Sequence, residues 1–162
     1  MILVAIGANL PGLDGRAPLD TCRATVEALD RLPGLRVASV SRWYRTRPLP
    51  PSGQPDYVNG AVRLTGAADP AVLLGQLQGI EAAAGRRRSQ PNAARTLDLD
   101  LIGIGALVRS APDPVIPHPR LHERAFVLVP LAELVPGWIH PVLGRSVADL
   151  LDSLSSQAVD PL

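Results

Sequence analysis

Apolar side chains recur in this chain at two different spacings, and the order of the two patterns limits the possible folds. Alternating or continuous apolar residues are typical of strands, whereas spacings of three and four residues are typical of helices. The patterns follow the order strand, helix, strand, strand, helix, strand over residues 1–7, 18–32, 35–44, 57–64, 69–84 and 97–104. This order predicts an α+β domain built around an antiparallel sheet with helices on one side.

Proline, glycine and aspartate mark the ends of the expected helices. Pro18 suits the first turn of the first helix, and Pro33-Gly34 closes it. Asp69-Pro70 is a favourable start for the second helix, and Gly85 ends it. The resulting element order is that of a ferredoxin-like unit.

The remaining residues extend this unit at its C-terminal side. We expect a helix over residues 121–135 despite Pro130, although the apolar run 126–129 would also suit a strand. A last helix is predicted over residues 146–154, and residues 155–162 are expected to fray. No linker interrupts the chain, so residues 1–162 are interpreted as a single domain.

The composition indicates a globular protein without bulk affinity for polyanions. Of the 162 residues, 46% are hydrophobic and 19% are charged, and the net charge of +1 gives no reason to expect binding to nucleic acid or to an anionic membrane. All basic residues are arginines, so no Walker A motif is present. The single Cys22 excludes an internal disulfide, and the apolar N-terminus lacks a basic leader; we expect a cytoplasmic protein.

Two aspartates dominate the chemistry that the sequence offers. In the expected strand over residues 97–104, Asp98 and Asp100 point to one face and the intervening leucines to the other. The two positions lie roughly 6.6 Å apart along the strand, within reach of a shared ion. A solvated strand face would explain the pattern equally well, but Arg86 and Arg95 nearby favour a site for Mg²⁺ and a polyphosphate.

Six short motifs together resemble one family of enzymes. They occur in order at suitable spacing, and they cover the chain from about residue 3 to about residue 151: Gly7-Ala8-Asn9-Leu10, Trp43-Tyr44-Arg45-Thr46, Gln54-Pro55-Asp56-Tyr57-Val58-Asn59, Gly85-Arg86-Arg87-Arg88, Arg95-Thr96-Leu97-Asp98-Leu99-Asp100 and Pro117-His118-Pro119-Arg120-Leu121-His122-Glu123-Arg124-Ala125-Phe126. The chain strongly resembles the 6-hydroxymethyl-7,8-dihydropterin pyrophosphokinases of folate biosynthesis.

The resemblance implies transfer of diphosphate from ATP to the hydroxymethyl group of 6-hydroxymethyl-7,8-dihydropterin, with release of AMP. It implies two Mg²⁺ ions held by Asp98 and Asp100, and it makes Arg86 and Arg95 the arginines that stabilise the transferring group. The positions that match residues around ATP are Gln78, Glu81, Arg88, His118 and Arg124. A functional link to dihydropteroate synthase is a further expectation.

For the pterin, the resemblance implies that Asn59 reads the hydrogen-bonding edge of the ring. Tyr57 and Phe126 would flank its faces, and the wall would be formed in part by Thr46, Pro48 and Leu49. Both aromatic residues would also suit a purely structural place in the core.

The chain departs from the family pattern between Arg88 and Arg95. Where the family carries a basic and then an aromatic residue, this sequence has Pro91 and Asn92. We expect a weaker closed state, and Asn92→Trp should then tighten pterin binding or raise turnover. Asp113 also lies where a basic ATP contact is common.

Three other interpretations remain at this stage. A family member with little or no activity would bind pterin or nucleotide without catalysis. An RNA-binding module on the same sheet order would need exposed aromatics and a basic surface, which two tryptophans, two tyrosines, one phenylalanine and a net charge of +1 do not favour. His118 and His122 have metal-pair spacing, but Pro117 and Pro119 place His118 in a loop.

Overall fold

The computed structural model describes residues 1–162 except residues 13, 49, 87–94 and 155–156. The elements in the described part are β1 (Ile2–Ala8), α1 (Pro18–Asp30), β2 (Leu35–Val40), β3 (Tyr44–Thr46), β4 (Tyr57–Gly66), α2 (Pro70–Ala83), β5 (Asp98–Ile104), the 3-10 turn η1 (Leu121–Glu123), α3 (Ala125–Leu134), α4 (Val147–Asp152) and β6 (Val159–Pro161). The predicted helix starts are confirmed at Asp69, which accepts a hydrogen bond from the amide of Val72 at 3.1 Å, and at Pro18.

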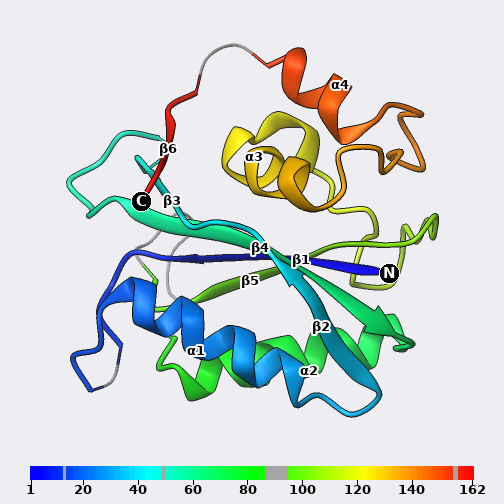
Figure 1. Ribbon diagram of the computed structural model, residues 1–162. Coiled ribbons are helices and arrows are strands. Elements are labelled where there is room, and N and C mark those ends of the chain that lie inside the picture. The colour runs from blue at the N-terminus through cyan, green and yellow to red at the C-terminus, as the bar shows by residue number, and fades with distance from the viewer. Residues whose placement is uncertain (13, 49, 87–94, 155–156) are drawn as a thin grey trace.

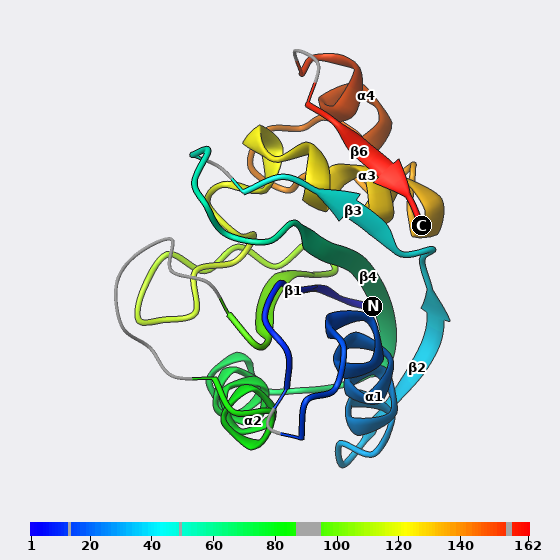
Figure 2. The same cartoon turned by 90° about the vertical axis from the view of Figure 1, so that its left-hand side faces the viewer.

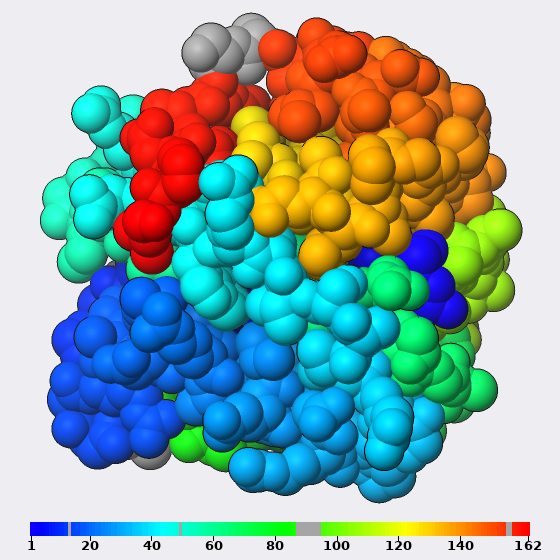
Figure 3. Space-filling model, viewed as in Figure 1, coloured from blue at the N-terminus to red at the C-terminus, as the bar shows by residue number. Residues whose placement is uncertain are grey.

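The strands form one antiparallel sheet in the order β5-β1-β4-β3-β6, with β2 also paired to β4. Helices α1 and α2 cover one face, and α3 and α4 lie on the other (Figures 1 and 2). This is an α+β, ferredoxin-like architecture whose C-terminal elements add a layer to the second face. In the space-filling view, the β2 and β3 segments in cyan run between the blue surface of α1 and the yellow-to-orange surface of α3 and α4 (Figure 3).

Strand β1 is buried on both faces, because it lies in the centre of the sheet between two apolar layers. Ile2, Val4 and Ile6 belong to the core beneath α1 and α2, whereas Leu3 and Ala5 belong to the core beneath α3 and α4. This burial explains why the first strand is continuously apolar rather than alternating. The sheet thus supports two separate cores, of which the second was not expected from the first six elements.

The prediction of one continuous strand over residues 35–44 is wrong, because the structure has two strands there, β2 and β3. Strands β2 and β3 both pair with β4, but residues 41–43 separate them. The Ser41 hydroxyl accepts a hydrogen bond from the amide of Ala61 at 2.9 Å and donates one to the carbonyl of Arg42 at 2.7 Å. The ring of Trp43 occupies the space over Gly60, where a Cβ atom would come within 2.5 Å of it. These contacts interrupt the ladder and redirect the chain along β4.

The C-terminal segment corrects a second expectation. Val159–Pro161 does not fray but forms β6, which pairs with β3 in the register Tyr44 to Pro161 (Figure 2). The amide of Leu162 also donates to the carbonyl of Trp43 at 3.0 Å. An edge strand offers unpaired backbone groups, so a short segment returning to β3 gains hydrogen bonds that its own sequence does not suggest.

The helical interpretation of residues 121–135 is confirmed as η1 followed by α3, and the strand alternative for 126–129 is wrong. Pro130 lies inside α3. The last helix is α4, and its N-cap Ser146 accepts from the amide of Asp149 at 3.1 Å.

Candidate active site

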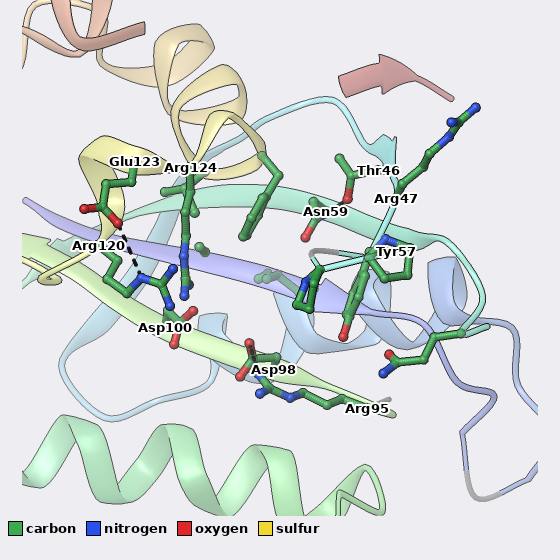
Figure 4. A pocket seen from close by; sticks show the side chains of 18 residues that line it. Thr46, Arg47, Tyr57, Asn59, Arg95, Asp98, Asp100, Arg120, Glu123 and Arg124 are labelled. Atoms are coloured by element: carbon green, nitrogen blue, oxygen red, sulfur yellow. Dashed lines mark hydrogen bonds and ion pairs between the residues drawn. The ribbon is translucent and has the colours of Figure 1, made fainter. Parts of the chain in front are cut away.

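Asp98 and Asp100 lie on the face of β5 that the alternation predicted. Leu97, Leu99 and Leu101 belong to the core beneath α1 and α2. The two carboxylates therefore face the side of the sheet that carries α3, and both line one cavity there (Figure 4). The strand pattern alone placed these two side chains correctly.

Two arginines hold the carboxylate of Asp98. Nη1 of Arg86 lies 2.8 Å from Oδ1 of Asp98, and Nη1 of Arg95 lies 2.7 Å from Oδ2. Each guanidinium thus neutralises one oxygen of the same carboxylate, which gives short, charge-assisted hydrogen bonds. The sequence prediction that these three residues act together is consistent with this geometry.

Glu81 extends the ion-pair network of Asp98, Arg86 and Arg95. Its side chain is only 4% exposed, pairs with Nη1 of Arg86 and accepts the amide of Leu99 at 2.8 Å. The carboxylate therefore ties the C-terminal end of α2 to the start of β5 and sets the position of Arg86. The Arg86 side chain is itself 9% exposed, so both charges of this pair lie in a weakly solvated setting.

Asp100 has a different environment from Asp98. Burial, followed by the negative charge of Asp98, raises the pKa of Asp100 to about 7. Its nearest imidazole is His118, whose Nε2 lies 3.9 Å from Oδ1 of Asp100. Burial and then Arg124 lower the pKa of His118 to about 4, so this imidazole is neutral at pH 7.

The neutral imidazole has a defined tautomer. Nδ1 of His118 accepts a hydrogen bond from the amide of Arg120 at 3.2 Å, which leaves the proton on Nε2, facing Asp100. His122 instead faces Glu123 and His140. The two imidazoles therefore face different partners, and His118 lies in a loop as predicted. In the part of the chain that the structure describes, no group of three or more His, Cys, Asp or Glu side chains converges on one point.

A cavity of about 290 Å³ lies above these carboxylates (Figure 4). Its walls come from β1, β3, β4, β5, η1 and α3 and from the proline-rich loop after β3. The residues that line it are Ala5, Ile6, Gly7, Thr46, Arg47, Pro48, Pro50, Gln54, Tyr57, Asn59, Arg95, Asp98, Asp100, Arg120, Glu123, Arg124, Phe126 and Val127. Apolar walls with a few polar groups are typical of a small-molecule site.

The pterin residues expected from the sequence meet in this cavity, apart from Leu49, which lies outside the described residues. Asn59 on β4 is 6% exposed and donates from Nδ2 to the hydroxyl of Thr46 on β3. Its Oδ1 lies over Gly7, where an added Cβ would come within 2.8 Å of it. The glycine on β1 thus leaves room for the amide to reach the cavity.

The expected ATP residues are distributed more widely. Arg124 lines the cavity, and His118 lies beside Asp100, but Gln78 is on the exposed side of α2 and Glu81 is buried beneath Arg86. The carboxylate of Glu81 therefore contacts Arg86 and the amide of Leu99. Arg88, Pro91 and Asn92 lie outside the described residues.

Sequence reasoning gave no role to Asn9, which the structure places at the junction of two segments of the site. Asn9 is 1% exposed. Its Nδ2 donates to Oε1 of Gln54 at 3.2 Å and to the carbonyl of Pro55 at 3.0 Å, and its Oδ1 accepts the amide of Arg95 at 2.8 Å. One side chain thus joins the proline-rich loop to the segment that carries Arg95. The sequence offered one signal of this role: an amide directly after an apolar strand is expected to be buried and to need hydrogen-bond partners.

No helix in the described ranges is long and apolar enough to cross a membrane.

Comparison with known proteins agrees with this geometry. Residues 3–136 match the family described as 7,8-dihydro-6-hydroxymethylpterin-pyrophosphokinase (HPPK). The 2-amino-4-hydroxy-6-hydroxymethyldihydropteridine pyrophosphokinase of Synechocystis sp. is 38% identical over 160 residues, which are 99% of this chain and 79% of the relative. The enzyme of the same name from Pseudomonas aeruginosa is 37% identical over 161 residues, 99% of this chain and 96% of the relative.

The fold also has a counterpart among solved structures. An HPPK-DHPS triple mutant of Plasmodium falciparum aligns with a TM-score of 0.67 and 11% sequence identity, over 93% of this chain and 43% of that chain. This likeness concerns the fold alone. The family profile and the two bacterial relatives cover most of the sequence, and on these grounds the chain belongs to the 7,8-dihydro-6-hydroxymethylpterin pyrophosphokinase family.

Proposed function

We propose that the cavity above β5 is where this chain carries out its family's reaction, the transfer of diphosphate from ATP to the hydroxymethyl group of 6-hydroxymethyl-7,8-dihydropterin with release of AMP. The observation that carries the proposal is the meeting of two kinds of residue in one cavity. Asp98, Asp100 and Arg95 line one part of it, and Tyr57 and Asn59 line another (Figure 4). A polyphosphate and a flat heterocycle would thus be held side by side.

We propose that Asp98 and Asp100 together hold two Mg²⁺ ions. The donor set fits this group, because Mg²⁺ binds carboxylate oxygens and takes its other ligands from water and phosphates. Burial and then the charge of Asp98 raise the pKa of Asp100, and a cation bound between the two carboxylates would offset both effects. When bound, Mg²⁺ lowers the free-energy cost of negative charge on the attacking oxygen and on the phosphates.

The chain's own residues would position and stabilise the transferring group. Arg95 lines the cavity and would lie next to a phosphate bound at Asp98, whereas Arg86, which is 9% exposed, approaches Asp98 from its other side. A bond forms between the hydroxymethyl oxygen and the β-phosphorus, and the hydroxyl proton passes to solvent. The bond from that phosphorus to the α-β bridging oxygen breaks, and AMP leaves with the electron pair. Fixed guanidiniums stabilise the charge that develops on these oxygens without reorganisation.

We propose that Asn59 forms hydrogen bonds with the edge of the pterin ring. The hydroxyl of Thr46 takes one amide proton of Asn59, which fixes the orientation of the amide. Tyr57, Phe126 and Pro48 line the same cavity and supply apolar surface for the ring. The roles of Leu49 and Arg88 remain predictions from the sequence.

Around ATP, Arg124 and His118 are the proposed direct contacts, and Gln78 is proposed to contact the nucleotide from α2. For Glu81 we propose an indirect role, in which it positions Arg86. A cytoplasmic location is proposed from the single cysteine, Cys22, and a functional link to dihydropteroate synthase is supported by the HPPK-DHPS name of the Plasmodium chain.

The test is an assay of AMP release from ATP and 6-hydroxymethyl-7,8-dihydropterin, with and without Mg²⁺. AMP should appear only when the pterin and Mg²⁺ are both present, and Asp98→Ala and Asp100→Ala should each abolish turnover. Formation of ADP would contradict diphosphate transfer. Activity above a few per cent in either variant would remove that aspartate from the proposed metal site. The matched control is Arg31→Gln at the exposed C-terminal end of α1, which should leave turnover unchanged.

A further inference from the structure

Arg120 and Arg124 bring two guanidinium groups to the same wall of the active-site cavity, beside Asp100 (Figure 4). They flank the single turn η1, so the three residues of that turn separate them along the chain. The turn is held by the amide of Arg120, which donates to His118, and by the amide of Arg124, which donates to the carbonyl of Leu121 at 3.3 Å. Arg120 precedes this 3-10 turn and Arg124 follows it, and both side chains line the cavity.

Asp100 and Asp98 offset the charge of Arg124 from a distance, without a direct ion pair. Within the described residues, no carboxylate lies within ion-pair distance of the Arg124 guanidinium, whose recorded partner is the ring of Phe126 at 5.5 Å. Burial, followed by the charge of Arg120, lowers the pKa of Arg124. Two like charges in a partly buried wall are unfavourable unless an anion is placed between them.

Arg120 is held only weakly in its observed position. Its Nε lies 3.5 Å from Oε2 of Glu123, and the two side chains are 61% and 55% exposed. Exposed ion pairs of this kind contribute little to stability, since water screens them and both side chains retain freedom. Arg120 can therefore exchange Glu123 for another anion at low cost.

We propose that Arg120 is a second phosphate-binding arginine of this active site, which leaves Glu123 when ATP binds and contacts the phosphates together with Arg124. This assignment rests on the proposed function of the cavity. A guanidinium can donate two parallel hydrogen bonds to phosphate oxygens. These two bonds would replace the single, long contact of Arg120 with Glu123.

The experiment measures binding of Mg·ATP by calorimetry in the absence of pterin, at low and moderate salt. Arg120→Gln is expected to raise the dissociation constant by about tenfold, the effect of losing a hydrogen bond to a charged group. This variant should also reduce the salt dependence of binding. The dissociation constant of Arg120→Lys should lie between those of the unmodified protein and Arg120→Gln. The matched control is Arg31→Gln, which removes an exposed arginine paired with Glu27 at 3.8 Å on α1 and should leave binding unchanged.

A second variant separates competition from simple loss of charge. Glu123→Gln frees Arg120, so we expect Mg·ATP to bind more tightly, and this gain should vanish in the double variant with Arg120→Gln. A dissociation constant for Arg120→Gln within twofold of the unmodified protein would overturn the assignment of Arg120. If Asp98→Ala still abolished binding in that case, the proposed function would stand; absence of Mg·ATP binding by the unmodified protein would refute both.

Discussion

Asn9→Ala is the perturbation that most directly tests how the active site is assembled. The substitution removes three side-chain hydrogen bonds of 2.8, 3.0 and 3.2 Å, which join residues 54–55 to Arg95 through a side chain that is 1% exposed. At about 1 kcal/mol for each bond, the expected loss of unfolding free energy is about 3 kcal/mol. For a chain of this size, that corresponds to a fall in Tm of roughly 6–12 °C.

The assay combines urea unfolding with steady-state kinetics. Since Asn9 links the pterin-side loop to the segment of Arg95, we expect KM for the pterin to rise and kcat to fall in the same variant. Thr25→Val is the matched control, because it removes one buried hydrogen bond of 2.8 Å within α1 and touches neither segment. It should cost at most about 1 kcal/mol and leave KM unchanged.

The reasoning fails if Asn9→Ala unfolds within about 1 kcal/mol of the unmodified protein. It also fails if stability falls but both kinetic constants stay the same. That second result would show that the loop and Arg95 keep their positions without the amide.

Three further predictions concern the network and the cavity. Glu81→Gln should lower the unfolding free energy by about 3 kcal/mol in urea titrations and should lower kcat, because it leaves the guanidinium of Arg86 buried without this carboxylate. Mg²⁺ binding measured by calorimetry should weaken below pH 7, because Asp100 with its pKa raised to about 7 holds a proton that the metal must displace. Gly7→Ala should raise KM for the pterin more than tenfold in steady-state assays, since its Cβ would lie 2.8 Å from Oδ1 of Asn59.

Two of these three predictions have a control variant. Gly75→Ala on α2 introduces a Cβ with nothing within 4 Å, so it should leave KM unchanged and increase stability slightly. Asp100→Asn removes a proposed ligand, so it should bind Mg²⁺ weakly and to the same extent at pH 6 and pH 8. An unchanged KM in Gly7→Ala, a stable and fully active Glu81→Gln, or metal binding equal at pH 6 and pH 8 would each contradict the corresponding argument.

The local sequence was sufficient for features that depend on short-range geometry. Alternation in residues 97–104 placed Asp98 and Asp100 on one face of β5, because successive side chains of a strand point to opposite sides whatever surrounds them. Asp69 capped α2 as expected, because its side chain reaches an amide only three residues away. The order of the patterns then gave the ferredoxin-like arrangement of the first six elements.

Tertiary structure decided everything that required partners distant in the chain. Ser41 breaks β2 from β3 because it bonds with Ala61, and residues 159–161 become a strand because β3 has a free edge. The same holds for the site, where Glu81 is drawn beneath Arg86 and the amide of Asn9 bridges segments 45 and 86 residues away. Hydrogen bonds and ion pairs between remote segments leave no periodic trace in a sequence, since they depend on how the folded layers bring those segments together.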